Sequence, residues 1–210
     1  MPFLGSKPGG GGERRERLIP RRQLGADGLD LGRGERSHRP GRWLRVSPGL
    51  LGRANIYARS VAGVTPRASV TYFQAQRALA NSGKRLLTNA EWQSAVAGSP
   101  DGASCNVSSG SVQSTGANAA CISTDGANDM VGNLWEWVGD WLPVSTGCPS
   151  WGAFSNDDMC LSGASATATA PGALLRGGAF GSGLGAGPFA VSGDAQPSAS
   201  NADVGFRGAR

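Results

Sequence analysis

The sequence contains a single histidine, no C-x-x-C pair and no long apolar run. Because His38 is the only histidine, a zinc site built from cysteine and histidine is not expected. No stretch of about eighteen apolar residues is present, so no transmembrane helix is expected. The first residues, MPFLGSKPGGGGERRERLIPRR, carry charges where a signal peptide requires an apolar core. These absences argue against a zinc protein and a membrane-spanning protein.

Positive charge is scarce outside the first sixty residues. Residues 1–60 hold 13 Lys or Arg and 5 Asp or Glu, a net charge of +8, whereas residues 61–210 hold 7 and 10, a net charge of −3. Nucleic-acid binding requires clustered Lys and Arg on the folded surface, so we expect no nucleic-acid partner. Residues 1–55 are rich in Gly and Arg and lack the apolar residues that would offset ordering entropy. We predict that they are a disordered tail or arise from a misassigned start, and that residues 56–210 form one domain.

The cysteines all lie in the middle of the domain. Their order and spacing predict two local disulfides, Cys105–Cys121 and Cys148–Cys160. Reduced thiols are the alternative. If the disulfides form, the domain functions outside a reducing cytosol.

Two helices are predicted near the start of the domain. In the first, within SVTYFQAQRALANSG, apolar residues recur at helical spacing: Phe73, Ala75, Ala78 and Leu79. The second begins at Thr88, because Glu91 three residues later completes a capping-box pattern, and it ends by Gly98. After Gly98 the chain is rich in Gly, Ser, Asn and Asp and has only short apolar pieces, which predicts short strands between long loops.

The segment DGANDMVGNLWEWVGDW, residues 125–141, concentrates tryptophans and acids. Trp135 and Trp137 alternate with Glu136, as in a strand with partly buried indoles. The carboxylates of Asp129 and Glu136 flank a glycine-bearing turn, and such oxygen donors suit calcium. We expect either a structural calcium site or a metal-free turn.

Four motifs, taken in order, resemble the landmarks of the formylglycine-generating-enzyme or sulfatase-modifying-factor family. They are GKRLLTNAEWQSAVAG, DMVGNLWEWVGDW, LLRGGAF and VGFRGAR, and they span about residues 60–210. The resemblance implies an α+β, C-type-lectin-like fold that is rich in loops, with two helices and short antiparallel strands. It also places the family's calcium site on Asp129 and Glu136, with the carbonyl groups of Gly132 and Leu134 nearby.

In the enzymes of this family, a copper-binding cysteine pair lies between the RGG and GFR motifs. Here residues 181–203 contain no Cys, His, Lys, Arg, Tyr or Trp, so nothing in them can bind copper softly or exchange electrons. We therefore expect no copper and no catalysis. The same fold is used by variable proteins of diversity-generating retroelements, whose mutated segment occupies this place, and residues 176–207 resemble that segment.

The sequence thus predicts a non-catalytic protein that binds a ligand through its C-terminal segment. The alternative is a member of the enzyme family that lacks the usual cysteines. Arg176 and Arg207, together with Trp135 and Trp137, are predicted to be structural. We expect a protein or glycan partner on a cell surface, and an extracellular, cell-surface or phage-associated location. The candidate ligand-binding residues are Phe180, Ser182, Leu184, Ala186, Phe189, Val191, Ser192, Asp194, Ser198, Ser200 and Asn201.

Overall fold

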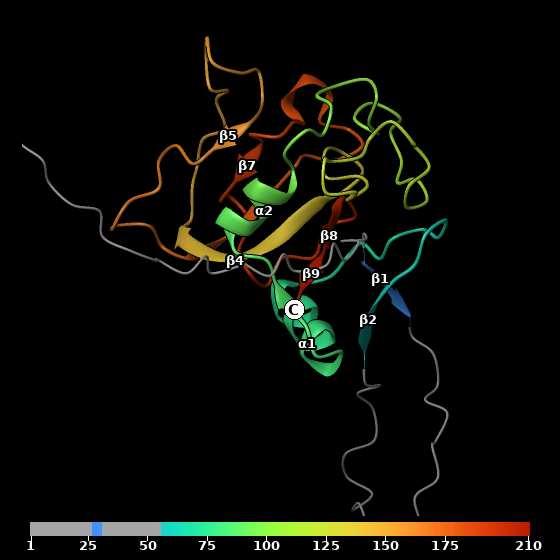
Figure 1. Cartoon of the computed structure of the whole chain (residues 1–210). Helices are drawn as coiled ribbons and strands as arrows, with labels where there is room; N and C mark the ends of the chain where they lie inside the picture. Colours follow the sequence, from blue (N-terminus) through green and yellow to red (C-terminus); the bar gives the residue numbers. More distant parts are fainter. Residues whose placement is uncertain (1–26, 31–55) are drawn as a thin grey trace, which may run out of the picture.

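The structure is a computed structural model that describes residues 27–30 and 56–210, the former for the backbone only. Its main element is a five-stranded sheet in the order β5-β7-β6-β4-β8 (Figure 1). The strands are β4 (Trp135–Pro143), β5 (Met159–Cys160), β6 (Pro171–Arg176), β7 (Val191–Ser192) and β8 (Val204–Phe206). The central strands β4 and β6 are antiparallel, whereas β8 pairs with β4, and β5 with β7, in parallel.

Two helices pack beside this sheet. Helix α1 (Tyr72–Asn81) begins with a capping box formed by Thr71 and Gln74. Helix α2 (Asn89–Ala95) begins with the predicted capping box of Thr88 and Glu91. Between them, β3 (Arg85–Leu86) pairs with β9 (Gly208–Ala209) near the end of the chain. The predicted loop-rich α+β fold with two helices is confirmed.

The apolar face of α1 differs from the prediction by one residue. Tyr72 is buried and packs edge to face on Trp137, with ring centroids 6.0 Å apart, whereas Phe73 is 52% exposed. Tyr72, Ala75 and Leu79 lie three and four residues apart and therefore share a face, while Phe73 is turned by about 100° from Tyr72. Phe73 instead contacts the half-exposed Trp141 at the end of β4.

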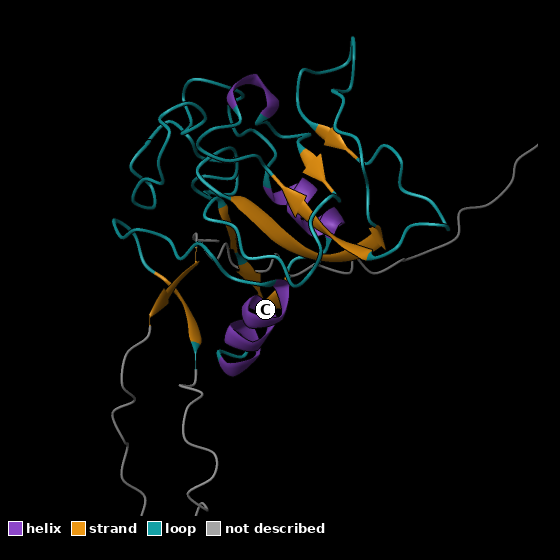
Figure 2. Cartoon of the chain, turned by 180° about the vertical axis from the view of Figure 1, so that it is seen from behind, coloured by secondary structure: helices purple, strands orange, loops and turns teal. Residues whose placement is uncertain are grey.

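Long loops form most of the upper part of the domain, seen from behind in Figure 2. Residues 97–134 contain no helix or strand, only isolated bridges such as Asn106 to Gly132. The predicted Cys105–Cys121 disulfide is present and closes part of this region. Its buried sulfurs lie in a second apolar cluster, which α2 shares with the loops through Trp92 and Val96.

A short strand is described within the predicted tail. Residues 27–30 form strand β1 (Asp27–Asp30), which pairs antiparallel with β2 (Tyr57–Ser60). The division of the chain into a tail of residues 1–55 and a domain of residues 56–210 stays a prediction. The remaining residues of that segment, 1–26 and 31–55, lie outside the described residues.

Candidate ligand-binding surface

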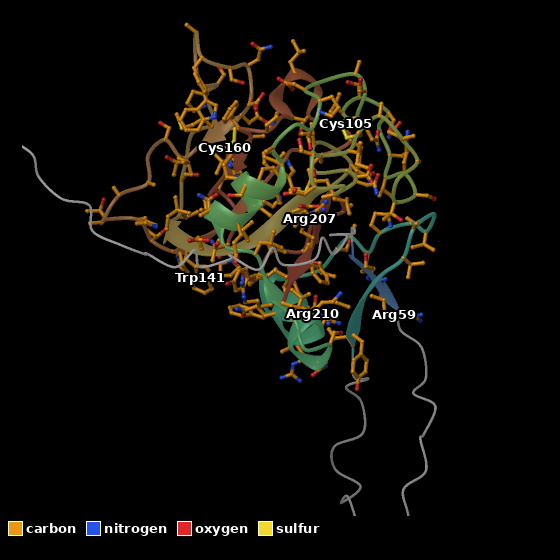
Figure 3. The ribbon with its side chains drawn as sticks, viewed as in Figure 1. Arg59, Cys105, Trp141, Cys160, Arg207 and Arg210 are labelled. Atoms are coloured by element: carbon orange, nitrogen blue, oxygen red, sulfur yellow. A yellow bond between two sulfur atoms is a disulfide. The ribbon has the colours of Figure 1, made fainter. Side chains whose placement is uncertain are left out.

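A buried ion pair joins the final GFR motif to the central strand. The guanidinium group of Arg207 donates two hydrogen bonds of 2.6 Å to the two carboxylate oxygens of Glu136. The same guanidinium group donates to the carbonyl oxygens of Asn128 and Asp129, at 3.1 and 3.2 Å. The indole nitrogen of Trp92 adds a third bond to Glu136, at 2.8 Å. Arg207 lies in the interior of the domain (Figure 3) and links β4, α2 and the loop before β4.

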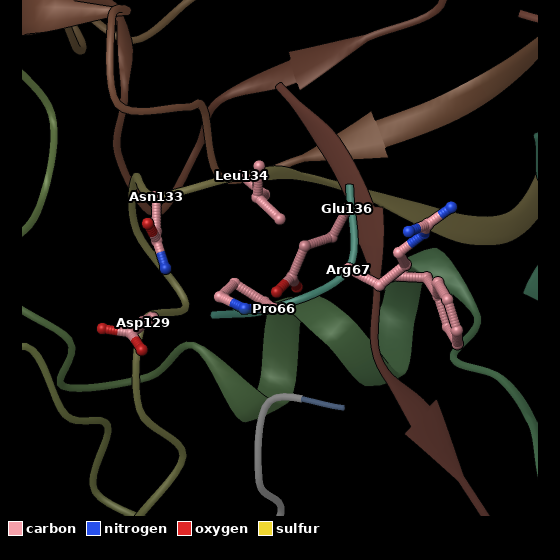
Figure 4. A pocket seen from close by; sticks show the side chains of 7 residues that line it. Pro66, Arg67, Asp129, Asn133, Leu134 and Glu136 are labelled. Atoms are coloured by element: carbon pink, nitrogen blue, oxygen red, sulfur yellow. The ribbon is translucent and has the colours of Figure 1, made fainter. Parts of the chain in front are cut away.

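The contacts of Glu136 bear on the calcium prediction. Both oxygens of Glu136 already accept from a cation, so an ion at this carboxylate would have to share these oxygens with the guanidinium group of Arg207 or displace it. Asp129 accepts from the backbone nitrogen of Gly116 at 2.7 Å, and in Figure 4 its carboxylate points away from that of Glu136. The hollow between them, beside Leu134, has a volume of about 20 Å³, enough for one water molecule. The calcium site on Asp129 and Glu136 stays a prediction, with the metal-free turn as its alternative.

Asp129 is also held in an unusual conformation. Its φ of 54° lies in the left-handed region, as do those of Gly132 and Asn133 in the same turn. Burial raises the pKa of Asp129, and the bond from Gly116 and the charge of Arg207 oppose that shift. At Gly132 a Cβ atom would lie 2.4 Å from the carbonyl oxygen of Asn106, so the turn requires glycine there. Because it lacks a side chain, Gly132 allows its turn to pack closely against the loop that carries Asn106.

The RGG motif is anchored by Arg176. Its guanidinium group donates to the carbonyl oxygens of Phe189 and Ala190 and to the side-chain oxygen of Gln93. It also lies over the ring of Trp92, 4.8 Å from the centroid, a cation–π arrangement. Burial lowers the pKa of Arg176 to about 10, and the nearby charge of Asp157 opposes the shift. Arg176 thus fixes the path of the segment that follows it.

The candidate ligand-binding residues divide into exposed and buried groups. Leu184 is 73% exposed and Phe189 is 40% exposed. Phe180 and Ser182 are half-buried. The polar residues Asp194, Ser198, Ser200 and Asn201 are exposed.

Three candidates are not on the surface. Ala186, Val191 and Ser192 are at most 4% exposed. Val191 and Ser192 form β7, which lies between β5 and β6, and Ala186 packs against Gly178. Ala186 and Val191 therefore offer almost no surface to a ligand. Ser192 still lines a hollow.

That hollow, which we call the sheet pocket, lies over the five-stranded sheet and has a volume of about 220 Å³. Its apolar lining comes from Trp135, Leu175 and Val204. Three carboxylates and one amide also line it: Asp158, Asp194, Asp203 and Asn201. A second hollow of about 520 Å³ lies between the loop of residues 102–118 and Leu184.

Sequence reasoning missed the loop that faces this segment. Trp151 and Phe154 are 39% and 69% exposed, and Phe154 packs on Phe189 with ring centroids 4.9 Å apart. We call Trp151, Phe154 and Phe189 the aromatic patch. The indole nitrogen of Trp151 donates to the carbonyl oxygen of Phe189 at 3.0 Å. Two aromatic residues in a short loop between paired cysteines were the available signal, since such a loop has little room to bury them.

The predicted Cys148–Cys160 disulfide is present and closes this loop, on the other side of the domain from Cys105 (Figure 3). All four cysteines of the chain are disulfide-bonded, so the oxidised protein has no free thiol. The ligand atoms of Cys148, Cys160 and Asp158 lie within 4.8 Å of one another, a spacing that could hold a metal ion. The disulfide removes both thiolates, so only one carboxylate remains to bind an ion.

The fold and this surface define a loop-rich α+β domain of the C-type-lectin-like class. The chain belongs to the FGE-sulfatase family, described as the sulfatase-modifying factor enzyme 1-like domain, whose model matches residues 103–210. No curated protein sequence matches the chain. In the part of the chain that the structure describes, no helix is long and apolar enough to cross a membrane.

Solved structures of similar fold include variants of one protein. The Major Tropism Determinant P3c variant is 20% identical with a TM-score of 0.51, and the I1 variant is 22% identical with a TM-score of 0.50. Each match covers 74% of this chain and 45% of the solved chain. The chain therefore spans less than half the length of these proteins, and the likeness is one of fold.

Proposed function

We propose that this domain is a non-catalytic binding protein of the diversity-generating-retroelement class, and that its variable surface is the C-terminal segment 176–207. One observation carries the proposal. The two ends of the segment, Arg176 and Arg207, are buried and bonded to the scaffold, whereas Leu184, Phe189 and Asp194 between them are exposed. Fixed ends and an exposed middle allow side chains to change while the fold persists.

The chemistry of the segment supports a binding role. Residues 181–203 have no thiol, imidazole, amine or phenol, the usual groups for nucleophilic or acid–base catalysis. The family's enzymes use a cysteine pair in this segment, and the cysteines of this chain lie elsewhere and are bonded to each other. The exposed aromatic patch has the composition of a binding hot spot.

The solved structures of similar fold support variation, because they are named as P3c, U1, M1 and I1 variants of a tropism determinant. By this likeness we propose that the partner is a protein or glycan on a cell surface. We further propose that the domain acts in an extracellular, cell-surface or phage-associated location. The two disulfides agree with a site outside a reducing cytosol.

The experiment is a pair of matched libraries in the full chain. One library randomises four exposed positions of the segment, Leu184, Phe189, Asp194 and Ser198. The other randomises four buried positions of the same segment, Ala186, Val191, Ser192 and Ala195. The fraction of protease-resistant members is then measured in each.

We expect most of the exposed library and few members of the buried library to fold, because surface substitutions usually change stability by less than about 0.5 kcal/mol. If both libraries lose the fold equally, the segment is scaffold and the proposal fails. A neighbouring reverse-transcriptase gene with a near-copy of the codons for residues 176–207 would add genetic support.

A further inference from the structure

We propose that the hollow of about 520 Å³ between the loop of residues 102–118 and Leu184 binds a neutral sugar residue of a cell-surface glycan, without calcium. We call it the loop hollow. This inference rests on the proposed binding function and deepens it, because it selects a glycan as the partner and names the chemistry that recognises it.

The two walls of the loop hollow are joined by hydrogen bonds. The backbone nitrogen of Gly183 donates to the carbonyl oxygen of Val107 at 2.8 Å, and that of Gly110 donates to the carbonyl oxygen of Phe180 at 3.3 Å. Leu184, which is 73% exposed, lines the hollow from the side of the C-terminal segment. A ligand that fills the hollow therefore meets both the loop and an exposed position of the proposed variable segment.

Both walls are free of charge. Residues 102–124 and residues 177–193 contain no Asp, Glu, Lys, Arg or His, and none of the described residues that line the hollow is charged. A phosphate, carboxylate or ammonium group would lose hydration here and gain no opposite charge. Calcium is disfavoured for a related reason, since the lining offers it no carboxylate. The loop hollow therefore suits an uncharged polar ligand.

The polar groups of the lining are amides and hydroxyls. The side chain of Gln113 accepts from that of Asn118 at 2.9 Å, which leaves the amide nitrogen of Gln113 and the side-chain oxygen of Asn118 without a partner among the described residues. Ser108 adds an exposed hydroxyl group. Sugar hydroxyl groups both donate and accept, so they match this mixed set. The exposed side chains of Ala103 and Leu184 offer apolar atoms to the C–H face of a sugar ring.

Asn106, which also lines the loop hollow, gives an independent indication that a donor binds there. Its amide nitrogen donates to the carbonyl oxygen of Ser111 and to the side-chain oxygen of Asn133, at 3.0 Å each, and the residue is 4% exposed. Its side-chain oxygen receives no hydrogen bond from any described residue. A buried acceptor without a donor is costly, so a ligand rich in hydroxyl groups gains affinity by supplying one, directly or through a bridging water.

The backbone of the walls favours a sugar over a peptide. Extended peptides bind by pairing with the edge of a strand. The loop of residues 102–118 contains no strand, and the opposite wall is the short 3-10 helix of Gly183–Gly185. A sugar residue needs only the side-chain groups that the hollow offers, and the volume of about 520 Å³ lies in the range of small-ligand sites.

The test is an array of defined neutral and sialylated glycans, probed with the full chain in buffers that contain either calcium or a chelator. The chain is biotinylated at an appended tag and tetramerised on streptavidin, because multivalency raises the avidity of weak single contacts. We expect neutral glycans to bind equally in both buffers and to be displaced by the corresponding free sugar.

The deciding variant is Gln113→Glu, which keeps the oxygen that accepts from Asn118 and replaces the free amide donor by a carboxylate oxygen. We expect it to weaken glycan binding about tenfold. Leu184→Asp places a charge on the opposite wall at an exposed position and should weaken binding similarly. Gln76→Glu is the matched control, since it adds the same charge on the exposed face of α1, and it should leave binding unchanged.

Four results would overturn the inference. Unchanged binding by both Gln113→Glu and Leu184→Asp would place the glycan outside the loop hollow. Binding that requires calcium would assign recognition to a metal site, and binding of sialylated glycans alone would show that the ligand is charged. An array without signal from the folded wild-type chain would exclude a glycan partner. Each of these results leaves the proposed function standing, since that is tested by the two libraries.

Discussion

Replacing Arg207 by lysine removes the planar guanidinium group, which can donate two parallel hydrogen bonds, and keeps the positive charge. In the native protein this guanidinium group donates two hydrogen bonds of 2.6 Å to Glu136 and two more to backbone carbonyl groups. The two side chains are 2% and 8% exposed, so water cannot replace the lost partners. A lysine ammonium group is a point donor and cannot span both carboxylate oxygens.

The expected cost follows from these contacts. Breaking a buried ion pair by removing one partner costs about 3–5 kcal/mol, and retaining the charge should recover part of that, so we expect a loss of about 2–4 kcal/mol. For a domain of this size, such a loss lowers the melting temperature by roughly 5–15 °C.

The assay is thermal unfolding of the full chain, with calcium and with a chelator. Arg85→Lys is the matched control, since Arg85 also makes two bonds of 2.6 Å to a carboxylate, that of Glu91, but with side chains that are 50% and 42% exposed. We expect the control to lose at most about 1 kcal/mol. Glu136→Gln should be destabilising to the same extent in both media. A loss confined to the calcium sample would refute the metal-free reading, and equal effects of the two arginine variants would refute the role of burial.

Three further outcomes are expected. Val191→Ser should lower the free energy of unfolding by about 2 kcal/mol, and Leu184→Ser by less than about 0.5 kcal/mol, as measured by urea unfolding, because only Val191 is buried. Replacing Cys105 and Cys121 together by serine should cost roughly 3 kcal/mol, the chain-entropy value for a loop of this length, and four free thiols in non-reducing peptide maps of wild-type protein would contradict the pairing. Asp158→Asn should raise the melting temperature slightly at neutral pH. Since the folded-state pKa of Asp158 is raised, its penalty is absent below the unfolded pKa and grows as pH rises through the folded value, so the gain should vanish in acid.

The elements governed by local rules were predictable from the sequence. The capping box of Thr88 and Glu91 depends on residues three apart, and it starts α2 where expected. The two disulfides followed from cysteine order and spacing. The class of fold followed from four motifs in order, because each motif marks a fixed place in the scaffold.

Features that depend on tertiary contact were not predictable in the same way. Glu136 and Arg207 are 71 residues apart, and nothing local says that they meet. The sequence therefore contains no indication of the ion pair at Glu136, which the calcium prediction has to accommodate. Val191 was a candidate ligand-binding residue, and a two-residue strand gives no alternation from which its burial could be read; the structure leaves it 4% exposed.

Residues 86–206 hold ten Asp or Glu and one Lys or Arg, and this excess of negative charge has a consequence for the speed of association. Most of these acids lie outside residues 176–207, so the excess persists when the exposed side chains of that segment change. Electrostatic attraction acts before contact and raises the association rate, whereas close packing sets the dissociation rate. A lineage of variants should therefore share a fast, salt-sensitive encounter with basic partners and differ in how long each complex lasts.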